Sequence, residues 1–245
     1  MCELFGMSSN EPDRATRSLP IFASKGSWCQ DGWGIGYYNN NEAVVQKFKD
    51  SVIQSENAHP AFLQTIQKTQ SSTILAHVRA ATSNQRDDCD SHPFIIRKFE
   101  RNWIFAHNGS IPKLVSDNYR SYVEPYSEID SARAFSFIMD KVENYLDQPG
   151  IKGLYPAIKN AVEEIRREMG GGMNFLLSDG SNLYVFNDSN HSNEIYYLQR
   201  RKSYGYAFLV TTISSGLSNE DWMILPQDRL LVLNRGEILV LSNKL

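Results

Sequence analysis

Two long amphipathic helical patterns lie in the middle of the chain, with strand-like runs on both sides, and this order constrains the fold most. From Asp130 to Leu146, apolar residues recur at steps of three and four, which is typical of one buried helix face. A second such pattern follows Tyr155 and runs to Met169. The run Gly170-Gly171-Gly172 comes next, and glycine tolerates the left-handed geometry of a helix C-cap.

The strand-like runs are short, rich in aromatic or β-branched residues, and separated by Gly, Asn and Asp. A shorter helix is predicted over Ala61–Lys68. Strands grouped around a helical pair, rather than alternating with helices, predict an α+β fold with two antiparallel sheets and helices packed outside them. No linker, repeat or composition shift divides residues 1–245, so we expect one domain. The predicted strands are Cys2–Met7, Trp33–Tyr38, Ala43–Phe48, Thr73–Arg79, Phe94–Arg97, Trp103–His107, Met173–Leu177, Leu183–Asn187, Ile195–Gln199, Tyr206–Thr212, Leu230–Asn234 and Ile238–Leu241.

Composition and charge exclude several classes of function. The chain has 41% hydrophobic and 22% charged residues, which is typical of folded proteins, and its net charge of -3 offers no basic surface for nucleic acid. No apolar run approaches the ~18 residues of a membrane span, and the N-terminus lacks a leader pattern. We therefore expect a cytoplasmic protein with neither nucleic-acid nor membrane partners.

Cys2 differs from the other two cysteines because of its position. Cys29 and Cys89 are expected to be small buried thiols. Removal of Met1 would leave Cys2 with a thiol and a free α-amine in one residue. In model compounds the amine titrates at ~7.7–8.0 and the thiol at ~8.5, so the amine can accept the thiol proton near neutral pH. A cysteine at this position is by itself more often an ordinary strand residue, so other residues must support the chemistry.

Two predicted strands end on residues that suit an acyl-transfer site. Arg79 can hold a carboxylate in a bidentate fork, and the Asn108 amide with the Gly109 backbone N–H can form a two-donor oxyanion hole. Each motif also has a plain structural explanation. Asn-Gly is a common tight-turn dipeptide, and an arginine at a strand end usually makes a surface ion pair.

Taken together, these residues resemble class II glutamine amidotransferases, most closely the stand-alone YafJ-like members. The resemblance implies the four-layer αββα sandwich of the N-terminal-nucleophile (Ntn) hydrolases. It is carried by short motifs, in family order, within residues 2–131. These motifs are Cys2-Glu3-Leu4-Phe5-Gly6, Asp31-Gly32-Trp33-Gly34-Ile35, His77-Val78-Arg79-Ala80-Ala81-Thr82, His92-Pro93-Phe94, His107-Asn108-Gly109 and Asp130-Ser131.

The resemblance also implies catalytic roles. Cys2 would attack the side-chain amide of glutamine, and its α-amine would move the proton. Asn108 and Gly109 would stabilise the tetrahedral oxyanion. Ammonia then leaves, and water releases glutamate, so no cofactor is implied.

Further residues are implied in substrate binding. Arg79 would bind the α-carboxylate of glutamine and Asp130 its α-ammonium, a pairing that reads both charges of a free amino acid. Thr82 would line the site, and Trp33 and His92 would help to shape it.

The sequence departs from the family pattern near two of these residues. Ile129 and Ala132 stand where the family usually has Thr and Glu around Asp130. Asp130 as the N-cap of the following helix is therefore an alternative of nearly equal weight. Asp90-Ser91 replaces a frequent Asn before His92, so loop 83–91 is expected to close over substrate differently.

A metal site and two other functions are alternatives to the glutaminase. The nominal metal ligands follow no short zinc spacing, so no metal is predicted. One alternative function is an Ntn hydrolase acting on a γ-glutamyl amide, and another is a non-catalytic subunit that keeps the fold. For the amidotransferase we expect glutamine as substrate and a separate ammonia-acceptor enzyme as partner. The nominal metal ligands are His77, Asp87, Asp88, Cys89, Asp90, His92 and His107.

Overall fold

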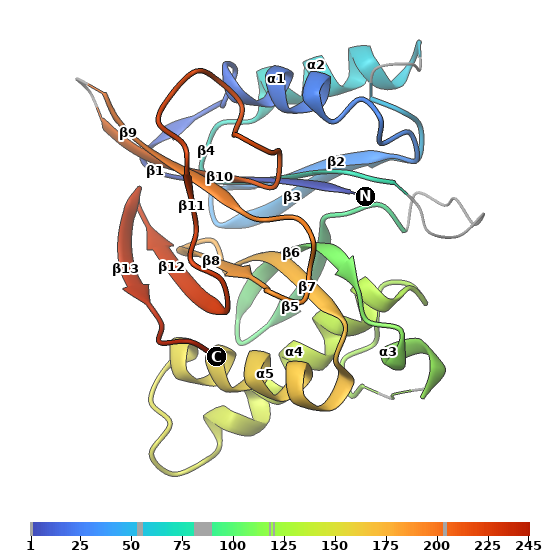
Figure 1. Ribbon diagram of the computed structural model, residues 1–245, viewed down its shortest axis with the longest axis vertical. Helices are drawn as coiled ribbons and strands as arrows, with labels where there is room; N and C mark the ends of the chain where they lie inside the picture. Colours follow the sequence, from blue (N-terminus) through green and yellow to red (C-terminus); the bar gives the residue numbers. More distant parts are fainter. Residues whose placement is uncertain (1, 53–55, 81–89, 118, 120, 203–204) are drawn as a thin grey trace.

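Two β-sheets lie face to face, and helices cover the outer face of each, in the computed structural model (Figure 1). The structure describes residues 2–245 except 53–55, 81–89, 118, 120 and 203–204. This arrangement confirms the α+β class and the four-layer αββα sandwich that the sequence predicts. None of the described helices is both long and apolar enough to cross a membrane.

The first sheet has seven strands and contains the N-terminal strand near its middle. Its paired strands are antiparallel. In spatial order they are β11 (Met223–Ile224), β9 (Tyr196–Lys202), β10 (Gly205–Thr211), β1 (Glu3–Asp13), β4 (Ser71–Val78), β2 (Trp33–Asn39) and β3 (Glu42–Phe48).

The second sheet has six strands, which are also paired antiparallel. In spatial order they are β13 (Glu237–Leu241), β12 (Arg229–Asn234), β8 (Asn182–Asn187), β7 (Gly172–Ser178), β6 (Arg101–Ser110) and β5 (Phe94–Lys98).

Helices α1 (Ser18–Lys25) and α2 (Ala58–Lys68) cover the seven-stranded sheet, while α4 (Asp130–Leu146) and α5 (Leu154–Met169) cover the six-stranded sheet (Figure 1). The short α3 (Lys113–Ser116) follows β6. Three apolar layers result, one under each helix pair and one between the sheets. Successive residues of one strand enter different layers: Leu4 packs between the sheets, whereas Phe5 packs under α1 and α2.

Several boundaries differ from the sequence prediction for physical reasons. Helix α2 begins at Ala58 instead of Ala61. Pro60 falls in the first turn, where proline is tolerated because backbone N–H groups there make no hydrogen bond within the helix. Helix α1 was not predicted; it is short and also carries a proline, Pro20, in its first turn. The C-cap prediction for the glycine run is confirmed, since Gly170 follows α5 with a φ of 63°.

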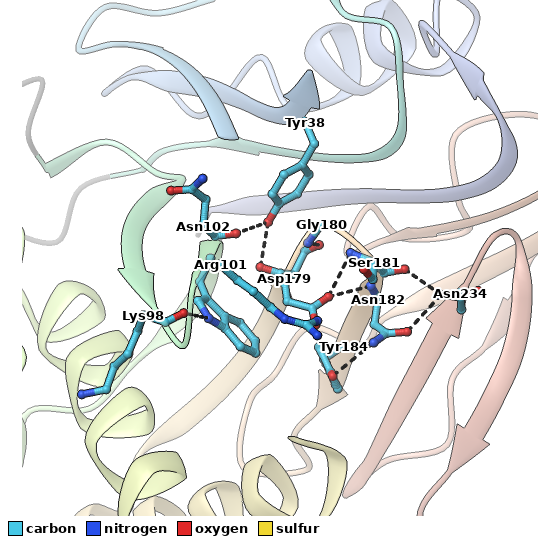
Figure 2. A network of polar contacts seen from close by, with 12 residues as sticks. Tyr38, Lys98, Arg101, Asn102, Asp179, Gly180, Ser181, Asn182, Tyr184 and Asn234 are labelled. Carbon is cyan, nitrogen blue, oxygen red and sulfur yellow. Dashed lines mark hydrogen bonds and ion pairs between the residues drawn. The ribbon is translucent and has the colours of Figure 1, made fainter. Parts of the chain in front are cut away.

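A polar network joins the two sheets at one end of the sandwich (Figure 2). The hydroxyl oxygen of Tyr38, on β2, lies 2.8 Å from the carbonyl oxygen of Ser178 and 3.0 Å from that of Asn102. Arg101 pairs with the buried carboxylate of Asp179 at 2.5 Å. The network lies at the opposite end of β2 from Trp33. Trp33 pairs with Val78 of β4, and Val78 pairs on its other side with Glu3 at the N-terminal end of β1.

Candidate active site

The sandwich brings Cys2 and Asn108 together from different sheets. Cys2 precedes β1 and Asn108 lies on β6. The Asn108 side-chain amide donates a hydrogen bond to the Cys2 backbone oxygen, with Nδ2 and O 2.6 Å apart. Both residues continue the alternation that sends Leu4 and Ala106 into the layer between the sheets. The candidate nucleophile and the candidate oxyanion donor therefore share one end of that layer.

The Cys2 thiol is held against the segment that follows β4. Its Sγ lies 3.3 Å from the Ala80 backbone nitrogen, which donates to it, and 3.4 Å from the Ala80 oxygen. Burial raises the pKa of this thiol, while the Ala80 N–H and the Arg79 charge act in the opposite direction. Because burial dominates, the thiol needs a base to take its proton.

Asn108 and Gly109 lie within a strand, so the tight-turn explanation of this dipeptide is wrong. Strand β6 continues to Ser110, and Asn108 and Gly109 pair with Asn174 and Met173 on β7. A Cβ atom at Gly109 would lie 1.9 Å from the Gly172 carbonyl oxygen, so no larger residue fits without moving the backbone. Close approach of the two strands, and not a turn, requires this glycine.

Arg79 is buried, so the surface ion pair expected as its plain explanation is also wrong. It follows β4, has 6% exposure, and its Nη2 lies 3.9 Å from a carboxylate oxygen of Asp90. Its Nη1 atom has no hydrogen-bond partner among the described residues. A buried guanidinium group normally has its donors paired, so Arg79 has donor capacity for an anionic ligand.

Asp130 is the first residue of helix α4 rather than its N-cap, a position occupied by Ile129. One carboxylate oxygen accepts the Ile111 backbone N–H at 2.8 Å, and the other accepts the Ser131 backbone N–H at 2.8 Å. A negative charge in the first helical turn is favourable. Asp130 is thus anchored to the segment after β6, close in sequence to Asn108 and Gly109.

The remaining predicted site residues differ in their placement. Trp33 is fully buried in the layer under α1 and α2, where it stacks on Phe48 with 4.9 Å between ring centroids. It therefore supports the seven-stranded sheet from the face opposite to Leu4. His92 is buried between His77 and Phe94, with ring-centroid distances of 4.2 and 4.5 Å. Thr82 lies outside the described residues.

Three buried histidines, His77, His92 and His107, lie near one another. The ring centroid of His92 lies 4.2 Å from that of His77 and 6.5 Å from that of His107. Burial lowers the pKa of all three, that of His77 to about 3, so they are neutral at physiological pH. The described residues contain no group of three or more His, Cys, Asp or Glu side chains placed to hold a metal ion. Asp87, Asp88 and Cys89 lie outside those residues.

Two polar residues near the site were not singled out from the sequence. Asn174 is buried directly across from Asn108, and its Nδ2 donates to the Asn193 oxygen at 2.6 Å. Glu3 is buried beside Cys2 and bonded to the Thr212 hydroxyl, and burial raises its pKa to about 7. An asparagine or a glutamate inside an otherwise apolar strand was the signal that could have marked them.

A family model described as glutamine amidotransferases class-II matches residues 1–212. The chain belongs to this family. Among its relatives is the putative glutamine amidotransferase YafJ of Escherichia coli K12, which is 31% identical over 218 residues, 86% of this chain and 80% of that protein. The probable glutamine amidotransferase DUG3 of Saccharomyces cerevisiae is 25% identical over 188 residues, 63% of this chain and 50% of that protein.

Solved structures share the fold. One is a predicted glutamine amidotransferase from Pseudomonas aeruginosa, with a TM-score of 0.66, 22% identity, and 98% of this chain and 100% of that chain covered. Another is the glutamine phosphoribosylpyrophosphate amidotransferase of Bacillus subtilis, with a TM-score of 0.70 and 16% identity. That match covers 98% of this chain and 49% of the other. The Ntn sandwich expected from the sequence is therefore confirmed.

Proposed function

We propose that the chain is a glutaminase that releases ammonia from the glutamine side chain through a Cys2 thioester. The observation that carries this proposal is the contact of Asn108 with Cys2 at one end of the sandwich. Family membership supports glutamine as the substrate. In this proposal residues 1–245 form one glutaminase domain.

The raised pKa of the Cys2 thiol means that a base must take its proton, and in this proposal the base is the α-amine of the same residue. Removal of Met1 frees this amine, which titrates at ~7.7–8.0 in model compounds. The amine takes the thiol proton, Sγ bonds to the amide carbon, and the proton passes to the departing ammonia. Water then attacks the thioester, with the same amine as its base, and glutamate leaves.

Charge develops on the amide oxygen only in the tetrahedral intermediates. The Asn108 amide carries two N–H groups, one of which donates to the Cys2 oxygen, so the second can meet the oxyanion together with the Gly109 N–H. The α-carboxylate and the α-ammonium group of glutamine do not react; in this proposal Arg79 binds the first and Asp130 the second. Thr82 lines the pocket in this proposal, while Trp33 and His92 shape it through the backbone of their segments.

The proposed partner is a separate enzyme that accepts the ammonia. Ammonia released into water is protonated and loses its nucleophilicity, so a dedicated amidotransferase transfers it through a shielded path. A hydrolase of γ-glutamyl amides would not need such a partner. Stimulation by a second protein therefore separates the two activities.

The test measures ammonia and glutamate release by the purified full chain, together with its intact mass. We expect a mass without Met1, turnover of glutamine, and loss of turnover in Cys2→Ala. Cys29→Ala is the matched control, because that cysteine is buried under α1 and α2. An inactive wild-type chain, or an active Cys2→Ala variant, would contradict the proposal.

The same assay is repeated with γ-glutamyl amides and with cell extract. Glutamine should be the better substrate, and the extract should stimulate its hydrolysis. Preference for a γ-glutamyl amide without any stimulation would replace the amidotransferase with the hydrolase.

A further inference from the structure

His107 and Ser131 connect strand β6 to the start of helix α4. The His107 Nδ1 atom lies 2.8 Å from the Ser131 hydroxyl oxygen, and both residues are buried. On the other side of the ring, Nε2 lies 3.4 Å from the Gly172 carbonyl oxygen. The imidazole thus bridges the N-terminal end of β7 and the first turn of α4.

The surroundings of the ring decide where its proton lies. Burial lowers the pKa of His107, so the ring is neutral and carries one N–H. A carbonyl oxygen only accepts hydrogen bonds, so the proton lies on Nε2, which faces Gly172. Nδ1 therefore accepts, and the Ser131 hydroxyl donates to it. Gly109 leaves room for this arrangement, since a Cβ there would lie 2.6 Å from Nε2.

The hydrogen bond to His107 keeps the Ser131 hydroxyl from donating to Asp130. The same oxygen lies 3.4 Å from the Oδ1 atom of Asp130, to which it would otherwise turn. A carboxylate has about four lone-pair sites. Two of those of Asp130 accept the Ile111 and Ser131 backbone N–H groups. With the hydroxyl directed at His107, the remaining acceptor capacity of Asp130 is kept for a ligand.

His107 also immediately precedes Asn108, and the two side chains point to opposite faces of the six-stranded sheet. His107 reaches α4, whereas Asn108 reaches Cys2 between the sheets. The dipeptide His107-Asn108 therefore links Asn108, the candidate oxyanion donor, to the start of α4, where Asp130 is the candidate acceptor for the ammonium group.

We infer that His107 and Ser131 are positioning residues that hold Asp130 ready for the α-ammonium group of the substrate, at a fixed offset from Asn108. This inference rests on the proposed glutaminase function. Neither residue touches the reacting atoms, so the effect of their loss falls on substrate binding. Removing one buried neutral hydrogen bond should raise KM for glutamine roughly 2- to 10-fold, with kcat changed by less than about twofold.

The test compares steady-state kinetics of the full chain in four variants. Ser131→Ala and His107→Phe should each raise KM for glutamine. Ser131→Thr keeps the hydroxyl and should restore KM to near the wild-type value. Ser136→Ala is the matched control, because Ser136 is buried in the same helix and its hydroxyl has no hydrogen-bond partner among the described residues.

A second readout does not depend on activity. Nitrogen-15 NMR of the ligand-free protein should show His107 as the Nε2–H tautomer, and Ser131→Ala should shift its Nδ1 resonance. If wild-type turnover is present but Ser131→Ala behaves as Ser136→Ala does, or if the Nδ1–H tautomer is found, this inference alone is overturned. If the wild type has no glutaminase turnover, the proposed function fails, and the positioning role fails with it.

Discussion

Replacement of Asn108 by alanine removes a side chain that contacts the nucleophilic residue itself. Its Nδ2 atom lies 2.6 Å from the Cys2 oxygen, and the residue is 2% exposed. In the proposed mechanism the same amide donates to the oxyanion. The loss of one such donor typically lowers kcat by about 10²–10³, or about 2.7–4 kcal/mol of transition-state stabilisation. KM should change little, because the charge on the oxygen exists mainly in the transition state.

The variant also loses a hydrogen bond in the folded state. The Cys2 oxygen loses its amide donor, which should lower the free energy of unfolding by about 0.5–1.5 kcal/mol. Asn174→Ala serves as the matched control, since Asn174 is buried across from Asn108 and bonds to Asn193 and Asp188 instead. We expect it to be destabilised at least as much, while its kcat stays within about tenfold of wild type.

The assay couples glutamate release to a dehydrogenase and is run beside urea unfolding of each variant. If Asn108→Ala retains the wild-type kcat, the oxyanion role is refuted. An equal fall in kcat in both variants would refute it as well, because disturbance of the β6–β7 pair would then account for the loss.

Three further predictions concern other residues of the site. Arg79→Ala should raise KM for glutamine much more than it lowers kcat, since the carboxylate charge is the same in substrate and transition state; an unchanged KM would leave Arg79 a structural residue. Burial holds the pKa of His77 at about 3, so the unfolded chain binds the extra proton below the ordinary pKa of 6.5. The contribution of His77 to the free energy of unfolding should therefore be full above pH 6.5 and fall by about 1.4 kcal/mol per pH unit below it. His77→Asn should flatten that slope in urea unfolding. Burial raises the pKa of Glu3 from 4.5 to about 7, so Glu3 contributes stability that is lost as pH rises through this range. Glu3→Gln should therefore make the free energy of unfolding rise more steeply with pH. An unchanged slope would contradict the assignment.

The sequence by itself determined most of the helices and strands and their order along the chain. Apolar periodicity predicted α4 from its first residue, Asp130, and α5 to its last, Met169, because a buried helix face must repeat every three to four residues. The short helix α1 was missed, since its single buried face spans two turns and gives a weak periodic signal. The candidate site residues Cys2, Arg79 and Asn108 were singled out from residue type and position, and their proposed roles came from the resemblance to class II glutamine amidotransferases.

Only the tertiary structure decided what these residues do for one another. Asn-Gly is compatible with a turn or with a strand, and the choice came from the approach of β7, which leaves no room for a Cβ at Gly109. The sequence pattern leaves open whether Arg79 lies on the surface or inside, and only the folded structure shows that it is buried, with Asp90 beside its guanidinium group. The bond between His107 and Ser131 joins residues 24 positions apart. Such contacts depend on how the layers pack, and a local sequence pattern carries no information about a partner in another layer.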